Sequence, residues 1–133
     1  MSSNIEVYTD GSCIPNPGKG GWAYIILQDE KEIKRDFGNS KFSTNNIMEM
    51  TSVIEALKFL HDKNNFTIYS DSQYVIHFCN GTWKKANRKK NLDLWAILDK
   101  VSLNKNIKWV HVRSHTGIFY NELVDSLAKN AII

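Results

Sequence analysis

The spacing of apolar residues changes once along this chain, near residue 46, and this change limits the folds open to it. Before that point, short apolar or alternating runs cover residues 4–9, 22–27 and 32–37. The glycines and prolines from Gly11 to Gly21 predict a turn-rich connection after the first run. Short runs joined by turn residues indicate strands that pair antiparallel. From Asn46 to about residue 62, apolar residues recur every three or four positions, which predicts an amphipathic helix.

The second half of the chain alternates helices with strands. We expect a strand over 66–70, a helix over 72–80, a helix from Leu92, a strand over 107–112 and a last helix over 121–131. The order βββαβααβα predicts an α/β fold with a five-stranded mixed sheet, three antiparallel meander strands plus two parallel strands, flanked by helices. A chain of 133 residues without repeat or linker is expected to be a single domain, residues 1–133.

Composition points to a protein inside the cell. No apolar run approaches the roughly 18 residues of a membrane span, and the N-terminus lacks a signal-peptide pattern. Cys13 and Cys79 are far apart and show no metal-ligand spacing, which favours reduced thiols and disfavours a structural zinc site. We therefore expect a cytoplasmic protein that contacts no membrane.

Four acidic residues fall where the predicted elements can bring them together. Asp10 follows the first strand and Asp71 follows the fourth, so adjacent parallel strands would deliver both to one sheet edge. Glu49 lies in the first turn of the first long helix, and Asp125 lies one turn into the last helix. Such a group of anions is unfavourable unless a cation neutralises it.

Each acidic residue alone also fits an ordinary role. Asp10 suits a turn, Asp71 suits a helix N-cap, and Asn46 with Glu49 has capping-box spacing, while Asp125 fits a solvated helix position. Taken together, four hard oxygen ligands favour Mg²⁺ or Mn²⁺, ions that can support phosphodiester hydrolysis. We therefore predict a divalent-metal site that acts on a nucleic acid.

Five blocks of sequence, in order along nearly the whole chain, resemble type 1 ribonuclease H, which cuts the RNA strand of RNA/DNA hybrids. The blocks are residues 8–13 with 16–18, residues 44–49, 69–75 and 92–95, and residues 115–117 with 121–125. The resemblance implies a ribonuclease H-like fold and an endoribonuclease that leaves 5′-phosphate and 3′-hydroxyl ends. Its substrate would be an RNA/DNA hybrid duplex.

The same resemblance implies a role for each acidic residue. Two Mg²⁺ ions are expected, with Mn²⁺ as a possible replacement: Asp10 would bind both, Glu49 and Asp71 would complete one site, and Asp125 the other. His115 matches a loop histidine that is thought to help proton transfer and product release. Imidazole suits this task because its unperturbed pKa of about 6.5 allows proton exchange near neutrality.

Neutral amides beside the carboxylates are expected to read the RNA. An enzyme that spares DNA must recognise 2′-hydroxyls, which A-like duplexes display in their wide minor groove, and amides can both donate and accept hydrogen bonds. The resemblance assigns this reading to Asn45, Asn46 and Gln73, and backbone-phosphate contacts to Thr44 and Asn16. Helix caps and polar turns are the alternative roles for Asn45, Asn46 and Gln73.

Residues 83–90 concentrate five basic side chains and no acidic one, in a chain of net charge +3. The best-known bacterial ribonucleases H insert an extra helix and a basic protrusion here, for which the eleven residues 81–91 are too few. By resemblance, Trp83 would pack on the DNA sugars, and Lys84, Lys85 and Arg88 would contact the substrate; a solvated loop is the alternative. We expect weaker hybrid binding than in members with the full protrusion.

A further departure from the family is Phe42, which stands where some relatives carry a phosphate-binding arginine. The leading prediction remains a monomeric hybrid endoribonuclease. Its alternatives are a non-catalytic hybrid-binding module, disfavoured by the intact carboxylates, and another superfamily nuclease such as a junction resolvase or transposase-like domain, disfavoured by the amides. The sequence leaves a stand-alone enzyme and a reverse-transcriptase domain both open, although the initial Met favours the former.

Overall fold

Five strands form one mixed sheet in the order β3-β2-β1-β4-β5 in the computed structural model, which describes residues 4–113 and 117–133. The strands are β1 (Ile5–Cys13), β2 (Gly18–Gln28), β3 (Lys31–Ser43), β4 (Asn65–Ser70) and β5 (Asn106–His111). The helices are α1 (Asn45–Phe59), α2 (Gln73–Cys79), the short 3₁₀ helix η1 (Lys85–Asn87), α3 (Leu92–Ser102) and α4 (Phe119–Asn130). This order confirms the predicted βββαβααβα arrangement.

The sheet combines an antiparallel half with a parallel half, as predicted. β1 pairs antiparallel with β2, and β2 with β3, whereas β4 pairs parallel with both β1 and β5. A parallel pair needs a crossover connection, and the helix α1 with its flanking residues supplies it between the meander and β4. β1 is therefore central, with the meander on one side and the helix-linked strands on the other.

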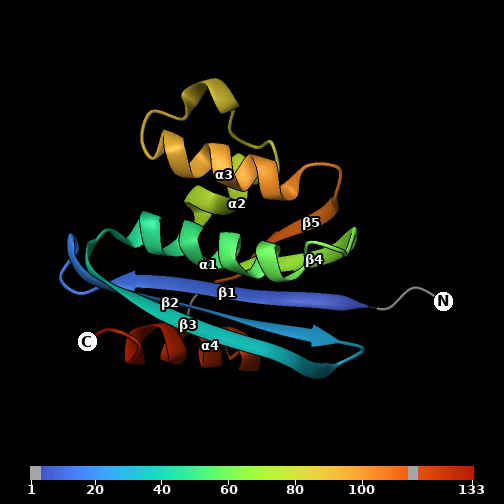
Figure 1. Cartoon of the computed structure of the whole chain (residues 1–133), viewed down its shortest axis with the longest axis horizontal. Coiled ribbons are helices and arrows are strands. Elements are labelled where there is room, and N and C mark those ends of the chain that lie inside the picture. Colours follow the sequence, from blue (N-terminus) through green and yellow to red (C-terminus); the bar gives the residue numbers. More distant parts are fainter. Residues whose placement is uncertain (1–3, 114–116) are drawn as a thin grey trace.

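Helices cover both faces of the sheet: α1, α2 and α3 lie on one side and α4 lies on the other (Figure 1). Val7 and Ile26 belong to the core beneath α1 and α3, where Trp95 is buried. The adjacent residues Tyr8 and Ile25 belong to the smaller core beneath α4. Because successive side chains of a strand point to opposite faces, two covered faces explain why β1 and β2 are buried or half-buried at nearly every position.

Glycines inside strands bring helices close to the sheet. A Cβ added at Gly11 would lie 2.2 Å from the carbonyl carbon of Met48, so only glycine lets the α1 backbone approach β1 so closely. A Cβ at Gly21 would lie 2.1 Å from the carbonyl oxygen of Ala128 in α4. The prediction of a turn-rich stretch beginning at Gly11 is therefore wrong: β1 continues to Cys13, and irregular backbone occupies only residues 14–17.

β3 forms one edge of the sheet and is longer than the predicted run of 32–37. Most of its residues are exposed, so its sequence lacks the apolar alternation of β1 and β2. Two register shifts interrupt its pairing with β2, one between Gly18 and Gly20 and one between Ile26 and Leu27. Among the described residues, no helix is both long and apolar enough to cross a membrane.

Candidate active site

A cavity of about 330 Å³ opens between β1, the first turns of α1, the turn after β4, and α4. It collects side chains that are far apart in the sequence. Seven of the residues predicted for the site line it: Asp10, Asn45, Asn46, Glu49, Asp71, Gln73 and Asp125. The elements therefore meet as the sequence predicted, at one end of the parallel pair β1 and β4.

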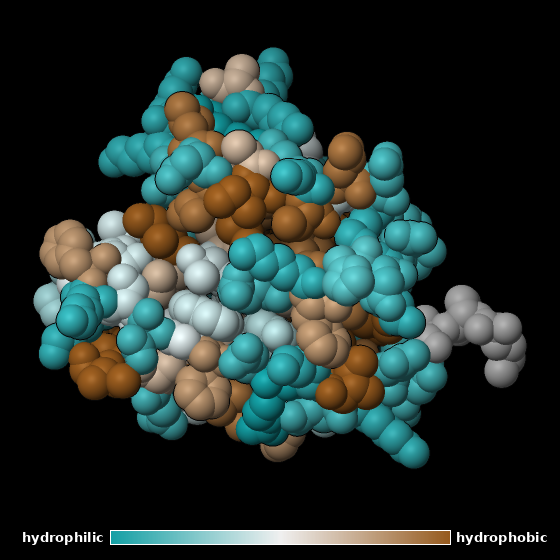
Figure 2. Space-filling view, in the orientation of Figure 1, coloured by the Kyte–Doolittle hydropathy of each residue, from teal (hydrophilic) through white to brown (hydrophobic). Residues whose placement is uncertain are grey.

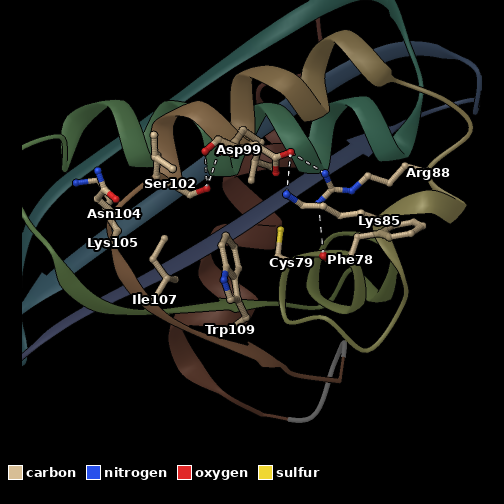
Figure 3. A pocket seen from close by; sticks show the side chains of 12 residues that line it. Phe78, Cys79, Lys85, Arg88, Asp99, Ser102, Asn104, Lys105, Ile107 and Trp109 are labelled. Atoms are coloured by element: carbon tan, nitrogen blue, oxygen red, sulfur yellow. Dashed lines mark hydrogen bonds and ion pairs between the residues drawn. The ribbon is translucent and has the colours of Figure 1, made fainter.

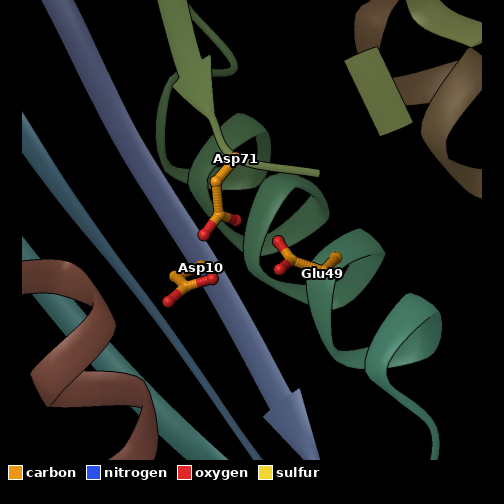
Figure 4. Close-up of side chains that lie close together, drawn as sticks. All are labelled: Asp10, Glu49 and Asp71. Carbon is orange, nitrogen blue, oxygen red and sulfur yellow. The ribbon is translucent and has the colours of Figure 1, made fainter. Parts of the chain in front are cut away.

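Three carboxylates point toward one another inside this cavity (Figure 4). Asp10, Glu49 and Asp71 each offer an oxygen atom, and these three atoms lie within 4.8 Å of one another. Asp10 is only 4% exposed and Glu49 only 8%. The close packing of α1 on Gly11 brings Glu49 beside the strand that carries Asp10.

The turn, capping-box and N-cap roles that the sequence allowed are not the roles that Asp10, Glu49 and Asp71 have in the structure. Asp10 lies within β1, not in a turn after it, although its Oδ1 accepts a hydrogen bond from the Gly11 N–H at 2.9 Å. Glu49 lies beyond the first turn of α1 and forms no capping box, because the N-cap is Thr44. The N-cap of α2 is Ser72, not Asp71.

Asp125 lines the same cavity from α4 and is more accessible than Asp10 and Glu49. Its Oδ2 lies 3.2 Å from Lys129 Nζ, one turn further along α4. It also lies near enough to Asp10 to contribute to the raised pKa of that carboxyl. Asp125 is thus the fourth carboxylate that lines the cavity, and it forms an ion pair with Lys129.

Burial and mutual repulsion make the ionised carboxylates costly. Burial, followed by the charge of Asp71 and the contact with Asp125, raises the pKa of Asp10 to about 8. Burial, with the charges of Asp10 and Asp71, also raises the pKa of Glu49 well above its usual range. Among the described residues, none donates a hydrogen bond to the buried Glu49 Oε2. Such an oxygen beside two further carboxylates suits a divalent cation with oxygen ligands.

The amide side chains surround this group of carboxylates. Asn46 and Gln73 are exposed at the cavity wall. Asn45 has a structural role as well, because its Oδ1 accepts a hydrogen bond from the Cys13 N–H at 2.6 Å. Its own N–H donates to Asn16 Oδ1 at 3.1 Å, which connects the β1–β2 turn to the start of α1.

Thr44 lies outside the cavity wall and caps α1. Its Oγ1 accepts a hydrogen bond from the Ile47 N–H at 3.2 Å, which satisfies one of the free amides of the first turn. The sequence did not point to this cap, because the capping-box spacing suggested Asn46 as the residue that starts the helix. The proposed contact of Thr44 with a backbone phosphate remains a prediction.

Comparison with known proteins identifies the family. A family model described as RNase H matches residues 2–133. The chain belongs to the ribonuclease H family. Proteins named Ribonuclease H are 46% identical in Wolbachia sp. subsp. Drosophila simulans (strain wRi), over 97% of this chain and 95% of that protein, and 43% identical in Ehrlichia chaffeensis, over 98% and 96%.

Solved structures support the ribonuclease H fold. LC11-RNase H1 in complex with an RNA/DNA hybrid aligns with a TM-score of 0.80 at 21% identity, covering 96% of this chain and 99% of that one. The N-terminal RNase H domain of a Mycobacterium tuberculosis protein, fused to maltose binding protein, aligns with a TM-score of 0.85 at 21% identity, covering 98% and 94%. At these identities the likeness concerns the fold alone.

Two residues that the sequence did not single out support this ribonuclease H site. Tyr74 lines the cavity, and its hydroxyl accepts hydrogen bonds from Trp95 Nε1 at 3.0 Å and Asn91 Nδ2 at 3.3 Å. His111 Nε2 lies 3.2 Å from the carbonyl oxygen of Asp71. Tyr74 is one position after Gln73, a signal that was available, whereas nothing in the sequence separates His111 from the other histidines.

The basic side chains of residues 83–90 do not line the carboxylate cavity, and they differ in how far they are exposed. Trp83 is 38% exposed, and its ring packs against Phe78 at a centroid distance of 5.2 Å. Lys84 and Lys85 are exposed, but the Arg88 side chain is only 7% exposed and pairs with Asp99. The prediction that Arg88 presents its charge to the substrate therefore does not fit its placement. His115 lies outside the described residues.

Proposed function

We propose that this chain hydrolyses the RNA strand of RNA/DNA hybrids with the help of divalent metal ions. The observation that carries the proposal is the convergence of Asp10, Glu49 and Asp71, whose oxygens lie within 4.8 Å of one another. One buried oxygen of this group accepts no hydrogen bond from the described part of the chain. Relatives of up to 47% identity are named Ribonuclease H, and LC11-RNase H1, which shares the fold, was solved with a hybrid.

Two Mg²⁺ ions fit this donor set best, with Mn²⁺ as a replacement. Carboxylate oxygens are the ligands that both ions prefer. Asp10 and Glu49 with Asp71 would hold one ion, and Asp10 with Asp125 the other. The bound ions would supply an activated water and neutralise the negative charge that develops on the phosphate.

The side chains around the carboxylates would position the hybrid. The exposed amides of Asn46 and Gln73, with the Asn45 amide nitrogen, would hydrogen-bond the 2′-hydroxyls of the RNA, which the DNA strand lacks. His115 would carry protons to or from the reacting groups near neutral pH. Breaking the bond between phosphorus and the 3′ oxygen leaves the oxygen of water on the phosphate, and hence 5′-phosphate and 3′-hydroxyl ends.

We further propose that residues 1–133 act as a single, monomeric domain in the cytoplasm. Support for this comes from the cores on the two faces of the sheet, which are both closed by helices of the same chain. The family model also extends over residues 2–133 without division.

A substrate panel tests the proposed reaction. The protein is incubated with labelled RNA/DNA hybrid, duplex RNA, duplex DNA and a four-way junction, each with Mg²⁺ or with EDTA. We expect Mg²⁺-dependent cleavage confined to the RNA strand of the hybrid. Binding without cleavage would favour a non-catalytic hybrid-binding module, and cleavage of the junction or of duplex DNA would favour another nuclease of the superfamily.

A further inference from the structure

Arg88 differs from the other four basic residues of the segment 81–91, because its side chain is turned into the protein. It is 7% exposed, compared with 72% for Lys85. Figure 2 shows hydrophilic side chains over the part that protrudes at the top of the view, where η1 lies in Figure 1. Arg88 lies beneath this surface.

The Arg88 guanidinium contacts both helices that flank the segment. Its carbon lies 4.0 Å from the centroid of the Trp95 ring of α3. Its Nη1 lies 2.8 Å from Asp99 Oδ2 on the same helix, as Figure 3 shows. Its Nη2 lies 3.5 Å from the carbonyl oxygen of Phe78 in α2. Stacking on an aromatic ring while binding two acceptors requires the planar fork of arginine, which lysine lacks.

The rest of the segment is attached mainly near its ends. The Trp83 N–H donates to the carbonyl oxygen of His77 at 2.9 Å, and the Tyr74 hydroxyl donates to the carbonyl oxygen of Lys90 at 3.5 Å. In between, the backbone bonds of η1 stay within the segment, from Asn87 to Lys84 and from Arg88 to Lys85. Lys85 Nζ also lies 3.6 Å from Asp99 Oδ2, but the Lys85 side chain is 72% exposed. The buried Arg88 side chain is therefore the main attachment of the middle of the segment to α2 and α3.

The segment borders a hollow that continues from the carboxylate cavity. This hollow, of about 220 Å³, is lined by Lys89 and Lys90 on the segment and by Asn46 and Tyr74 on the helices. Asn46 and Tyr74 also line the carboxylate cavity, so the two depressions share a wall. Lys89 and Lys90 lie along this shared groove, whereas Lys84 and Lys85 line neither depression.

We propose that Arg88 is a positioning residue, which holds the segment 81–91 so that Lys89 and Lys90 face the phosphates of the bound hybrid. The inference rests on the proposed function, since the hybrid is its ligand. A segment fixed before binding loses less conformational entropy when phosphates are bound. A short segment thus keeps two cations in place through one buried side chain.

Two readouts test this role in a cleavage-deficient Asp10→Asn background. The first is the rate of trypsin cleavage after Lys85 and Lys89 without nucleic acid, which reports whether the segment is held. The second is hybrid affinity by fluorescence anisotropy. We expect Arg88→Lys and Arg88→Met each to raise the rate of trypsin cleavage in the segment about tenfold, which corresponds to a loss of about 1.4 kcal/mol of local stability. We expect both to weaken hybrid binding about 3- to 10-fold.

A second variant separates positioning from charge. Asp99→Asn removes a negative charge near the segment, so a purely electrostatic effect would tighten hybrid binding. If Asp99 holds Arg88 in place, the same variant weakens binding and speeds trypsin cleavage. Lys31→Ala, at the opposite end of β1 in the β2–β3 hairpin, is the control for the loss of one positive charge. Circular dichroism establishes that each variant is folded.

Specific outcomes would overturn the proposal. Wild-type affinity in Arg88→Lys, with loss only in Arg88→Met, would mean that Arg88 acts through its charge. Unchanged trypsin cleavage in both variants would mean that the segment is held without Arg88. Failure of the Asp10→Asn protein to bind the hybrid would refute the proposed function. The rates of trypsin cleavage would still decide whether Arg88 holds the segment.

Discussion

The carboxylate cavity and the basic segment 81–91 gather charge in opposite ways. Asp10 and Glu49 are packed in the interior, where burial and the charges of neighbouring carboxylates raise their pKa values. Lys89 and Lys90 are exposed, and a buried side chain fixes the backbone that carries them. The acidic region therefore lowers folding stability until a cation binds, whereas the basic region is held by contacts within the protein. Metal ions should therefore change the folding stability, and salt should change the affinity for the hybrid.

The strongest test of this contrast is Asp10→Asn. We expect turnover of the hybrid to fall by about 10³-fold or more, which corresponds to about 4 kcal/mol of transition-state stabilisation. Hybrid binding should change little, because asparagine keeps the shape of aspartate and the lysine side chains proposed to bind the hybrid lie outside the cavity. Single-turnover cleavage and anisotropy measure the two effects, and a loss of binding equal to the loss of turnover would contradict the separation.

Gly11→Ala should damage the acidic region through the backbone. The added methyl would lie 2.2 Å from the Met48 carbonyl carbon, so α1 must move away from β1 and carry Glu49 with it. We expect a loss of about 1–3 kcal/mol of folding stability and weaker Mg²⁺ binding, measured by denaturant unfolding and calorimetry.

Gly81→Ala is the matched control for this change. Gly81 has a φ of +84° and nothing within 4 Å of an added Cβ, so alanine there costs conformational strain without a clash. We expect a smaller loss of stability, about 1 kcal/mol, and unchanged Mg²⁺ binding. Equal effects of the two substitutions on Mg²⁺ binding would show that the contact of α1 with β1 does not set the metal site.

The raised pKa of Asp10 predicts how the stability of the metal-free protein depends on pH. The folded state holds this proton up to about pH 8, whereas an unfolded chain releases it near pH 4. The folded state thus binds more protons between these values, and stability falls as pH rises toward 8. Asp10→Asn should therefore melt a few degrees higher than wild type at pH 9 and at the same temperature at pH 4, in EDTA.

Added Mg²⁺ should remove this difference, because a bound cation offsets the repulsion among the ionised carboxylates. We expect Mg²⁺ to raise the melting temperature of the wild type at pH 9 by more than that of Asp10→Asn. Equal shifts in the two proteins would mean that Asp10 does not bind the ion.

The smallest expected effect lies at the start of the basic segment. Lys84→Ala/Lys85→Ala should weaken hybrid binding less than Lys89→Ala/Lys90→Ala, because only the latter pair lines the groove. The slope of log affinity against log salt should become shallower by about 0.9 for each phosphate that the variant no longer neutralises. An identical salt slope for the two double variants would erase the distinction between the two halves of the segment.

Most of the fold and the acidic site could be predicted from the sequence, because both depend on patterns that the sequence displays. Apolar periodicity follows which faces are buried, so the order of elements was correct. β3 was predicted too short because an exposed edge strand has no buried face to produce alternation. Gly11 was misassigned to a turn because glycine permits both sharp turns and close backbone contact, and only the packed structure distinguishes these uses.

The basic segment was harder to predict because a run of charged residues does not indicate where each side chain points. A run of lysines and an arginine looks alike whether each side chain faces solvent or the protein. Arg88 differs from its neighbours only because Trp95 and Asp99, which follow along the chain on α3, lie opposite it. Such a tertiary pairing leaves no regular spacing in the sequence.

The edge strand β3 has a consequence for how copies of the protein meet one another. It offers a long row of backbone groups together with the exposed rings of Phe37 and Phe42, a combination that favours pairing with another strand. Lys31, Lys34 and Lys41 lie on the same strand, whereas Arg35 is paired with Glu32, and the interrupted register with β2 makes the edge irregular. Mutual repulsion of these cations opposes aggregation, so the charges of β3 govern solubility at high concentration more than they govern folding.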